Sequence, residues 1–401
     1  MTKNKMDDTF IKSLQKDLNK LDKKKQVAYF LGEDGVDSPS LVKGYVSTGS
    51  DILDIAISNR ADGGLPHGRV TLIGGLESSG KSLIIGHILA NAQKAGGIAI
   101  LFDTENAISE DFLESMGVDI SPESENKLML INEECLENIF EYIEMLIKKI
   151  SEKNFNKPII IAIDSIAGAT TKVEQEGDYD KAGWNTSKAI VLSQALRKIT
   201  PQLGRHNATL VCTSQYRDKL GVTFGDALTF SGGHSLPYHS SVILKLKRIG
   251  KITVKVNGVD EIIGVNVRAE VVKNKIGPPF RKVEFKVFFD RGIDNEASWL
   301  TTLKAHDIVT VGGAWYTYNH TDETGEIIPI KFQEKTFKEK IMNVPEYKTA
   351  LYELVLNKMQ MKYRSGDLKE ADMNIITDLG DTTVEEVDPL KEINIEESFK
   401  N

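Results

Sequence analysis

An eight-residue stretch from Gly75 to Ser82 limits the possible folds of this 401-residue chain more than any other feature. It matches the phosphate-binding pattern G-x-x-x-x-G-K-[ST] without a mismatch. A buried-strand pattern from Arg69 to Gly74 precedes it, and Leu83 to Ala90 follows with apolar residues at helical spacing. Because the motif requires this order of strand, turn and helix, its flanks favour a nucleotide site over a chance match.

The glycine-rich turn can form an anion cradle, because glycine lets successive backbone N–H groups converge on phosphate oxygens at the positive end of a helix dipole. We expect Lys81 to reach the β- and γ-phosphates and the Ser82 hydroxyl to ligate Mg²⁺. The expected ligands are therefore a nucleotide with β- and γ-phosphates and Mg²⁺. The residues predicted to bind the nucleotide here are Gly75, Leu76, Glu77, Ser78, Ser79, Gly80, Lys81 and Ser82.

Composition narrows the class of protein. A net charge of −8 argues against a uniformly basic nucleic-acid binder, but it leaves room for a local basic groove. Cys135 and Cys212 lie in apolar patterns without metal-ligand spacing, which predicts buried thiols in a reducing compartment. No N-terminal signal pattern and no long uncharged apolar run occur, so we expect a soluble, intracellular protein without a membrane partner.

The region around the motif alternates between apolar strands and amphipathic helices. Such alternation predicts an α/β fold with a mostly parallel sheet covered by helices on both faces. The predicted strands are 98–103, 128–131, 158–164 and 208–213, and the predicted helices are 109–116, 134–150 and 182–203.

Two acidic residues follow predicted strands. Asp164 ends the run 158–164, where the carboxyl ends of parallel strands face a ligand, so it can hold the water shell of the Mg²⁺ bound by Ser82; the alternative is a helix cap. Glu105 lies just beyond another strand and could polarise an attacking water, or it could be a cap or a surface acid.

Two polar, glycine-containing segments, 172–183 and 216–233, are long for connections in a compact domain. They are either surface loops or binding devices. The second contains Arg217, Lys219 and Phe224, a combination that suits single-stranded nucleic acid because cations follow phosphates and rings stack on bases.

The flanking segments have their own patterns. A helix capped by Thr9 should place Phe10, Leu14, Leu18 and Leu21 on one face, for packing on its own core or on a neighbouring subunit. Alternating strands are expected at 241–250 and 264–275, with end lysines that either protect an edge or reach a phosphate on another subunit. The acidic segment from Gly366 onward predicts a disordered tail that either competes with DNA for basic loops or only solubilises the chain.

Several segments together resemble the RecA family of homologous-recombination ATPases. The resemblance runs in unbroken order from Val46 to about Ile293, and Gly313 to Tyr316 still resembles the small C-terminal domain of that family. The segments that carry it are Thr48-Gly49-Ser50, Gly63 to Arg69, Gly75 to Ser82, Phe102 to Ala107, Ser193 to Lys198, Lys219 to Gly225 and Lys273 to Phe280.

The resemblance implies roles for residues of the ATPase. Glu105 matches the catalytic glutamate, and Gln215 matches the glutamine that senses the γ-phosphate and signals to the second DNA loop. Lys273 and Lys275 match lysines that contact ATP across a filament interface, so each active site, with Lys81, would be shared between subunits.

The resemblance also implies ligand and subunit contacts. Phe112 falls where an aromatic side chain packs on adenine, and Tyr238 falls where the family has a phenylalanine at the subunit contact. The segments 172–183 and 216–233 match the first and second DNA loops. The predicted DNA-binding residues are Arg197, Arg217, Lys219, Phe224, Gly232 and Gly233.

Some positions depart from the family pattern. A basic position two helical turns before Arg197 is apolar here, at Ile190, with Lys188 nearby as a candidate substitute. The linker before Thr48, the segment 318–336 and the tail also differ from the bacterial pattern, which would fit a phage-encoded or otherwise divergent member.

The resemblance predicts five regions: an N-terminal helical polymerisation segment (1–32), a linker (33–47), a RecA-like ATPase core with two DNA loops (48–293), a small C-terminal α/β domain (294–365) and the acidic tail (366–401).

The implied function is DNA-dependent ATP hydrolysis by a helical homo-oligomeric filament on single-stranded DNA, which pairs with duplex DNA in strand exchange. Recombination mediators or a single-strand-binding protein are implied partners, and the implied location is the nucleoid of a bacterial or phage-infected cytoplasm. The alternatives are a hexameric helicase of the same fold, against which Lys273 to Lys275 argue, and an ATP-switched filamentous regulator, against which Lys81 and Glu105 argue.

Overall fold

The computed structural model describes residues 8–21, 26–32, 38–153, 155, 157–177, 184–218, 228–230, 233–322 and 324–359. The predicted acidic tail at 366–401 and residues 219–227 of the second predicted DNA loop lie outside these residues. None of the helices in the described ranges is both long enough and apolar enough to cross a membrane.

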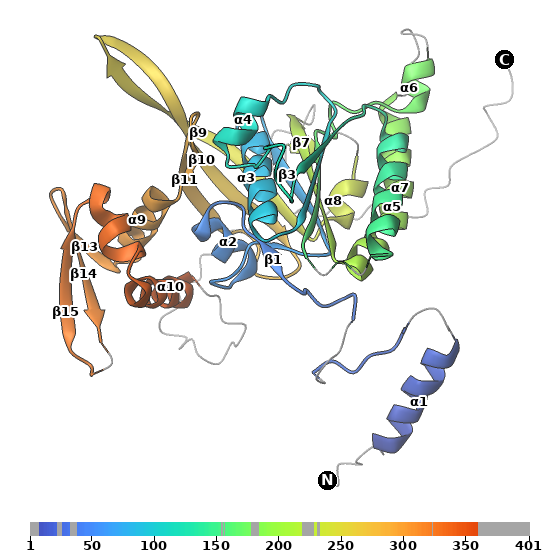
Figure 1. Ribbon diagram of the computed structural model, residues 1–401, viewed down its shortest axis with the longest axis horizontal. Coiled ribbons are helices and arrows are strands. Elements are labelled where there is room, and N and C mark those ends of the chain that lie inside the picture. The colour runs from blue at the N-terminus through green and yellow to red at the C-terminus, as the bar shows by residue number, and fades with distance from the viewer. Residues whose placement is uncertain are drawn as a thin grey trace, which may run out of the picture. The chain divides into compact units, whose positions relative to one another are not determined.

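A ten-stranded mixed sheet forms the centre of the molecule (Figure 1). Its order is β12-β11-β10-β9-β3-β7-β6-β4-β5, with β8 paired to β7. The strands are β3 (Val70–Gly75), β4 (Ile98–Asp103), β5 (Leu128–Asn132), β6 (Ile159–Asp164), β7 (Ala208–Asp218), β8 (Leu228–Phe230), β9 (Val242–Val256), β10 (Val259–Asn274), β11 (Lys282–Phe288) and β12 (Gly292–Asp294). The half from β9 to β5 is parallel, and β10 to β12 continue it in antiparallel fashion.

The parallel strands are apolar on both faces, as the alternation with helices predicts. In β6, Ile159, Ile161 and Ile163 belong to one hydrophobic cluster, while Ile160 and Ala162 belong to another. Since successive strand residues point to opposite faces, the two clusters lie on the two sides of the sheet. The predicted α/β architecture is confirmed.

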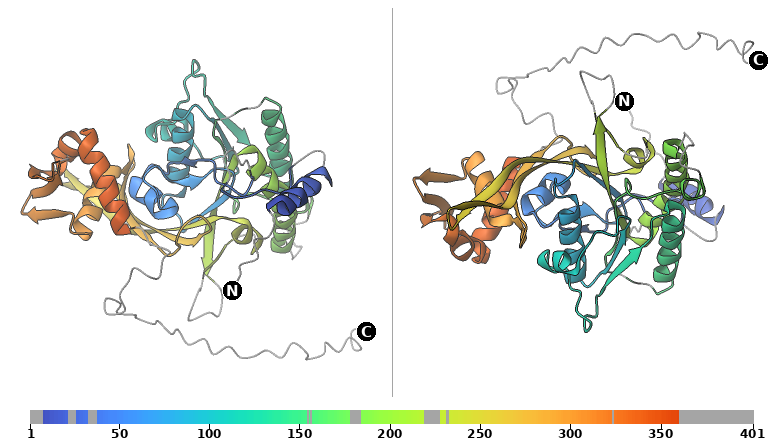
Figure 2. Two further views of the ribbon diagram at one scale, coloured as in Figure 1. Left: turned by 90° about the horizontal axis from the view of Figure 1, so that it is seen from below. Right: turned by 90° about the horizontal axis from the view of Figure 1, so that it is seen from above.

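Helices cover both faces. The helices α5 (Leu136–Ser151) and α7 (Trp184–His206) pack side by side on one face, as both views of Figure 2 show. The helices α2 (Asp51–Ser58) and α3 (Lys81–Lys94) contribute to the cluster on the other face. A short helix, α4 (Glu110–Ser115), begins at the cap residue Ser109, whose side chain accepts from Phe112 N. Six of the seven helices and strands predicted in this region therefore lie within three residues of their expected bounds, while β7 extends five residues beyond its predicted end at 213.

The C-terminal part combines α9 (Asn295–Ala305) and α10 (Pro345–Met359) with a three-stranded antiparallel sheet. Its strands are β13 (Val309–Gly312), β14 (Trp315–Thr321) and β15 (Ile327–Phe332). The buried indole of Trp299 donates a 2.8 Å hydrogen bond to the Asp51 carboxylate, and Arg281 bonds the carbonyl oxygen of Met359. These contacts attach the C-terminal part to α2 and to the sheet.

Three segments that were expected to be irregular contain short regular elements. The first proposed DNA loop begins as the helix α6 (Lys172–Glu176), because Thr171 and Glu174 form a reciprocal capping box. The second begins as strand, because β7 continues to Asp218 and pairs with β8 in a hairpin stem. In the predicted linker, β1 (Tyr45–Val46) pairs with β2 (Leu65–Pro66).

The N-terminal helix α1 (Asp8–Leu21) begins one residue before Thr9, so Thr9 lies within it instead of capping it. Its apolar stripe of Phe10, Leu14, Leu18 and Leu21 is exposed in the structure. The structure therefore does not show this stripe packed on the chain's own core, and docking on a neighbouring subunit stays a prediction.

The strands predicted at 241–250 and 264–275 are parts of a much longer hairpin. β9 and β10 continue past the sheet and pair as far as Val256 and Val259. Figure 1 shows this extension, in yellow, projecting away from the sheet. We call residues 249–263 the arm.

Candidate nucleotide site

The turn after β3 has the backbone shape that the motif requires. Ser78 and Gly80 adopt left-handed φ values of 55° and 90°, and α3 begins at Lys81. A Cβ atom on Gly75 would lie only 2.2 Å from Ser79 Oγ, so this position accepts no side chain without a shift. The first N–H groups of α3 consequently face the turn, where an anion would be stabilised.

Two donors in this turn fit phosphate oxygens. Lys81 Nζ donates to the carbonyl oxygens of Gly75 and Leu76, at 3.1 and 2.9 Å, so the ammonium lies within the turn. Ser79 Oγ is buried and has no hydrogen-bond partner among the described residues. Burial lowers the pKa of Lys81, and the carboxylates of Asp164, Glu105 and Glu77 act in the opposite direction. A phosphate would supply acceptors to both donors.

Asp164 lies at the carboxyl end of β6, buried beside the turn. Its Oδ1 accepts a 2.5 Å hydrogen bond from Thr213 Oγ1, and the Ser82 hydroxyl also bonds the carboxylate. Burial raises the pKa of Asp164, while these two hydroxyls lower it. Asp164 caps none of the described helices with an assigned N-cap, so the cap alternative finds no support there.

A divalent cation would have few direct protein ligands here. No group of three or more His, Cys, Asp or Glu side chains occurs among the described residues. The Ser82 hydroxyl and the Asp164 carboxylate are nonetheless in contact, and oxygen atoms are the donors that Mg²⁺ prefers. This pair fits a Mg²⁺ whose remaining ligands are phosphate oxygens and water.

Glu105 follows β4, the strand next to β6. Ser165 Oγ donates a 2.6 Å hydrogen bond to Glu105 Oε1, while the carboxylate itself is exposed at the mouth of the site. The cap of the following helix is Ser109, so Glu105 is not a helix cap. Both Glu105 and Lys81 act on the Asp164 carboxylate electrostatically, which places the three charged groups together.

Gln215 and Phe112 also lie near the turn. In the parallel register of β3 and β7, Gln215 is the partner of Gly75. Phe112 lines a cavity of about 490 Å³ that the turn itself helps to form. The lining residues are Ser78, Ser79, Gly80, Lys81, Ser82, Leu83, Phe112, Arg248, Lys251, Ile262, Val265, Val287 and Phe289.

Sequence reasoning missed the wall of this cavity that β9, β10 and β11 supply. Arg248 was expected only as part of a lysine-rich strand end, and Lys251, Ile262 and Phe289 were not expected at the site. The Asn257–Gly258 pair, a strong hairpin signal, could have revealed the arm, but only the folded structure shows which residues of the arm face the turn.

Lys273 and Lys275 lie at the other end of the sheet. Lys273 pairs with Ile243, which pairs with Leu72, whereas Gly75 follows three residues later on β3. Lys275 is farther still, since its N–H bonds the carbonyl oxygen of Ser241. At about 3.3 Å per strand residue, Lys273 lies about 10 Å from Gly75 of its own chain along the strand direction, and Lys275 lies farther away.

Tyr238 and Arg197 lie near these lysines. Lys273 Nζ donates to the carbonyl oxygens of Pro237 and Tyr238, at the end of the short helix α8 (Ser235–His239). Tyr238 is 74% exposed, and with Arg197 it lines a separate cavity of about 300 Å³. The structure thus divides these predicted site residues between the two ends of the strands.

The predicted DNA contacts are only partly described. Arg197 is exposed on α7, Arg217 lies on β7 opposite Thr229, and Gly233 has a φ of 77°. Lys219, Phe224 and Gly232 lie outside the described residues.

The suggestion that Lys188 substitutes for a basic residue at Ile190 is wrong. Lys188 is buried, and its ammonium donates to the carbonyl oxygens of Ala167 and Ala169, whereas Ile190 is 52% exposed. A buried ammonium held by two carbonyls cannot also reach a DNA phosphate on the surface.

Comparison with known proteins agrees with this geometry. The family model for the RecA N-terminal domain matches residues 12–294. The chain is 40% identical over 281 residues to "Protein RecA" of Leifsonia xyli subsp. xyli, covering 70% of this chain and 73% of that protein. It is 37% identical over 273 residues to "Protein RecA" of Methylococcus capsulatus, covering 68% and 73%, and 38% identical over 274 residues to that of Colwellia psychrerythraea, covering 68% and 74%.

Proposed function

The chain belongs to the RecA family, and on that premise we propose that it hydrolyses ATP at the Gly75–Ser82 turn while assembled as a filament on single-stranded DNA. It is a DNA-dependent ATPase of homologous recombination and DNA repair. The observation that carries the proposal is the convergence of Lys81, Ser82, Asp164 and Glu105 at the carboxyl ends of the parallel strands. No observation favours the helicase or the regulator.

Within this proposal, the phosphates of ATP take the place of the carbonyl oxygens that now accept from Lys81 Nζ, and Ser79 Oγ gains an acceptor. Mg²⁺ would be held by Ser82 Oγ and, through water, by Asp164. When bound, it would neutralise charge that develops on the transferred phosphoryl group. Phe112 would pack on the adenine at the side of the cavity.

Glu105 orients and deprotonates the attacking water in this proposal. Ser165 holds one carboxylate oxygen and leaves the other for the water. Gln215, the register partner of Gly75, is placed to sense the γ-phosphate and stands at the start of the β7–β8 hairpin stem. Binding of ATP would therefore change the conformation of the second DNA loop through Gln215.

Lys273 and Lys275 complete the site of the neighbouring subunit rather than their own. Their position at the opposite end of the strands supports this assignment, because Lys273 lies level with Leu72, three residues before Gly75, and on the far side of β9 from β3, which is beyond the reach of a lysine side chain. Tyr238, exposed beside Lys273, lies at the same subunit contact, and α1 docks on a neighbour through its exposed apolar stripe.

DNA contacts complete the proposal. Arg197, Arg217, Lys219, Phe224, Gly232 and Gly233 contact single-stranded DNA, which is held for pairing with a homologous duplex. Partners include recombination mediators or a single-strand-binding protein, and the protein acts at the nucleoid. The division into polymerisation segment, linker, ATPase core, C-terminal domain and acidic tail is part of the same proposal.

Steady-state ATP hydrolysis with and without single-stranded DNA, combined with imaging of the same samples, tests the proposal. Glu105→Ala and the pair Lys273→Ala with Lys275→Ala are compared with wild type. Turnover stimulated by DNA on helical filaments, lost in both variants, is expected. Turnover indifferent to DNA, or closed rings with active lysine variants, would contradict it.

A further inference from the structure

Strand β9 contributes two cations to the nucleotide cavity. Arg248 and Lys251 line the same cavity as the Gly75–Ser82 turn. Neither side chain makes a hydrogen bond or an ion pair with any of the described residues. Lys251 pairs across the strands with Val265, which also lines the cavity.

A β-bulge explains how both cations face the same way. In a regular strand, residues three apart point to opposite faces. Here Arg248 pairs with Val267 and Gly250 with Asn266, so Ile249 is an extra residue on β9. The bulge reverses the alternation, which aims Arg248 and Lys251 together at the turn.

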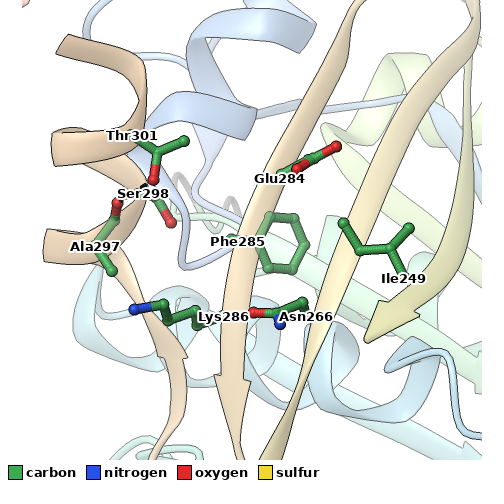
Figure 3. Close-up of a pocket in the computed structure, with 8 residues that line it drawn as sticks. All are labelled: Ile249, Asn266, Glu284, Phe285, Lys286, Ala297, Ser298 and Thr301. Atoms are coloured by element: carbon green, nitrogen blue, oxygen red, sulfur yellow. Dashed lines mark hydrogen bonds between the residues drawn. The ribbon is translucent and has the colours of Figure 1, made fainter. Parts of the chain in front are cut away.

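Ile249 points elsewhere. It lines a different cavity, of about 220 Å³, with Glu284 and Phe285 (Figure 3). The bulge therefore separates an apolar residue from the two cations that flank it. Bulges of this kind commonly re-aim a side chain beside an active site.

The charge of the cavity fits a single class of ligand. Among the residues that the structure describes, thirteen line the cavity, and they include three cations, Lys81, Arg248 and Lys251, and no carboxylate. Arg248 also lines a neighbouring cavity with Leu76, Glu77 and Ser79, so it lies at the phosphate end of the turn. The unpaired cations are placed for an anion that enters beside Lys81.

We propose that Arg248 and Lys251, brought to one face by the bulge at Ile249, bind the phosphate groups of the nucleotide held by the same chain. This inference rests on the proposed function and adds two ligand-binding residues to it. Together with Lys81 and the first amides of α3, these two cations neutralise the negative charge of the bound phosphates. Nucleotide affinity thereby depends on β9 as well as on the turn.

Binding of ADP and of adenosine, measured by calorimetry with the full chain and no DNA, tests the proposal. Lys251→Met keeps the aliphatic stem and should weaken ADP binding about threefold, and the double variant with Arg248→Met by roughly tenfold. Adenosine binding should not change, because it has no phosphate. Lys251→Arg should restore the affinity for ADP.

Lys255→Met is the matched control. Lys255 is on the same strand and face as Lys251, but it pairs with Asp260 nearer the tip and does not line the cavity. Its substitution should leave ADP binding unchanged. Equal weakening by Lys255→Met, unchanged ADP binding in the double variant, or equal loss for adenosine would each overturn the inference.

The same measurement distinguishes a wrong assignment of Arg248 and Lys251 from a wrong assignment of the nucleotide site. If wild type binds ADP and Lys81→Ala does not, the nucleotide site is supported, and the variants of Arg248 and Lys251 decide the inference. If wild type does not bind ADP, or Lys81→Ala binds as well as wild type, the proposed function fails and the inference fails with it. A thermal unfolding midpoint equal to that of wild type shows that each variant is folded.

Discussion

Lys273 Nζ donates a 2.9 Å hydrogen bond to the carbonyl oxygen of Tyr238, within the same chain. A second bond, of 2.7 Å, goes to Pro237 at the end of α8. Burial and the neighbouring Lys275 lower the pKa of Lys273. A lysine that we propose contacts the neighbour's ATP thus holds the end of α8, which follows the proposed second DNA loop. To reach a phosphate, it would have to release these carbonyls.

Lys273→Met should therefore have two effects. It should remove DNA-stimulated ATP hydrolysis, and it should also loosen α8 without nucleotide, because two carbonyls lose their donor. Hydrogen exchange of the Tyr238 and Ser240 amides, which bond His234 and Leu236, measures the second effect.

Lys275→Met is the matched control for the helix. Lys275 makes no side-chain hydrogen bond or ion pair within the part of the chain that the structure describes. Its substitution should reduce hydrolysis and leave amide exchange in α8 as in wild type. Equal exchange in the two variants would contradict the role assigned to the Lys273 contacts.

Glu105→Gln should reduce kcat by roughly 10²- to 10⁴-fold, because the amide cannot accept the proton of the attacking water. ADP binding should be retained, since Glu105 makes no part of the phosphate turn. Ser165→Ala should reduce kcat by no more than about tenfold, as it removes one hydrogen bond from the carboxylate. Single-turnover hydrolysis measures both, and a Ser165 variant as inactive as Glu105→Gln would contradict this order.

Gly75→Ala should abolish nucleotide binding. The new Cβ would meet Ser79 Oγ at 2.2 Å and the carbonyl oxygen of Leu246 at 3.0 Å, so the turn must shift. We expect a loss of about 1–3 kcal/mol in the free energy of unfolding. Gly312→Ala, where a Cβ meets nothing within 4 Å, is the control and should change neither quantity. Urea unfolding and ADP calorimetry measure the two effects, and ADP binding by Gly75→Ala would contradict the assigned geometry.

Acid should destabilise the fold through His67. Burial lowers its pKa to about 4 from the ordinary 6.5, and its Nε2 has no partner among the described residues. Because the unfolded chain binds the proton at higher pH than the folded one, the stabilisation is complete above pH 6.5 and is lost as pH falls toward 4. For a side chain only 6% exposed, the loss should be roughly 2 kcal/mol near pH 4.5.

His67→Gln should reduce this acid dependence of the free energy of unfolding, measured with urea at pH 7 and pH 4.5. His234→Gln, at an exposed position, should leave the dependence unchanged. An acid dependence of equal size in wild type and His67→Gln would show that other groups cause it. His87 should add to the wild-type loss, since burial lowers its pKa to about 4 as well.

The parts of the fold that the sequence predicted well are those with local or periodic signals. The β6 run ending in Asp164 needed only branched apolar residues and a terminal carboxylate, and the structure places it beside Ser82. Both cysteines are buried and free, as their apolar surroundings predicted.

The errors arose where contacts decide the outcome. The charged segment after Thr171 looked irregular, but the hydrogen bonds between Thr171 and Glu174 make it helical. Lys188 looked like a surface cation, but its ammonium is bound under the Ala167–Ala169 turn. Arg248 and Lys251 face the same side of the sheet because of a bulge, which the alternation of residues along the strand cannot predict.

The separation of Lys273 from Gly75 across the sheet affects how many complete ATP sites an assembly can have. If every site takes its lysines from the next protomer, an assembly of n protomers has n − 1 complete sites and one terminal site that lacks them. Turnover per protomer then rises with assembly length, and short assemblies on short DNA are the least active. The two ends also differ chemically, because one presents an incomplete nucleotide site and the other presents two lysines without a phosphate.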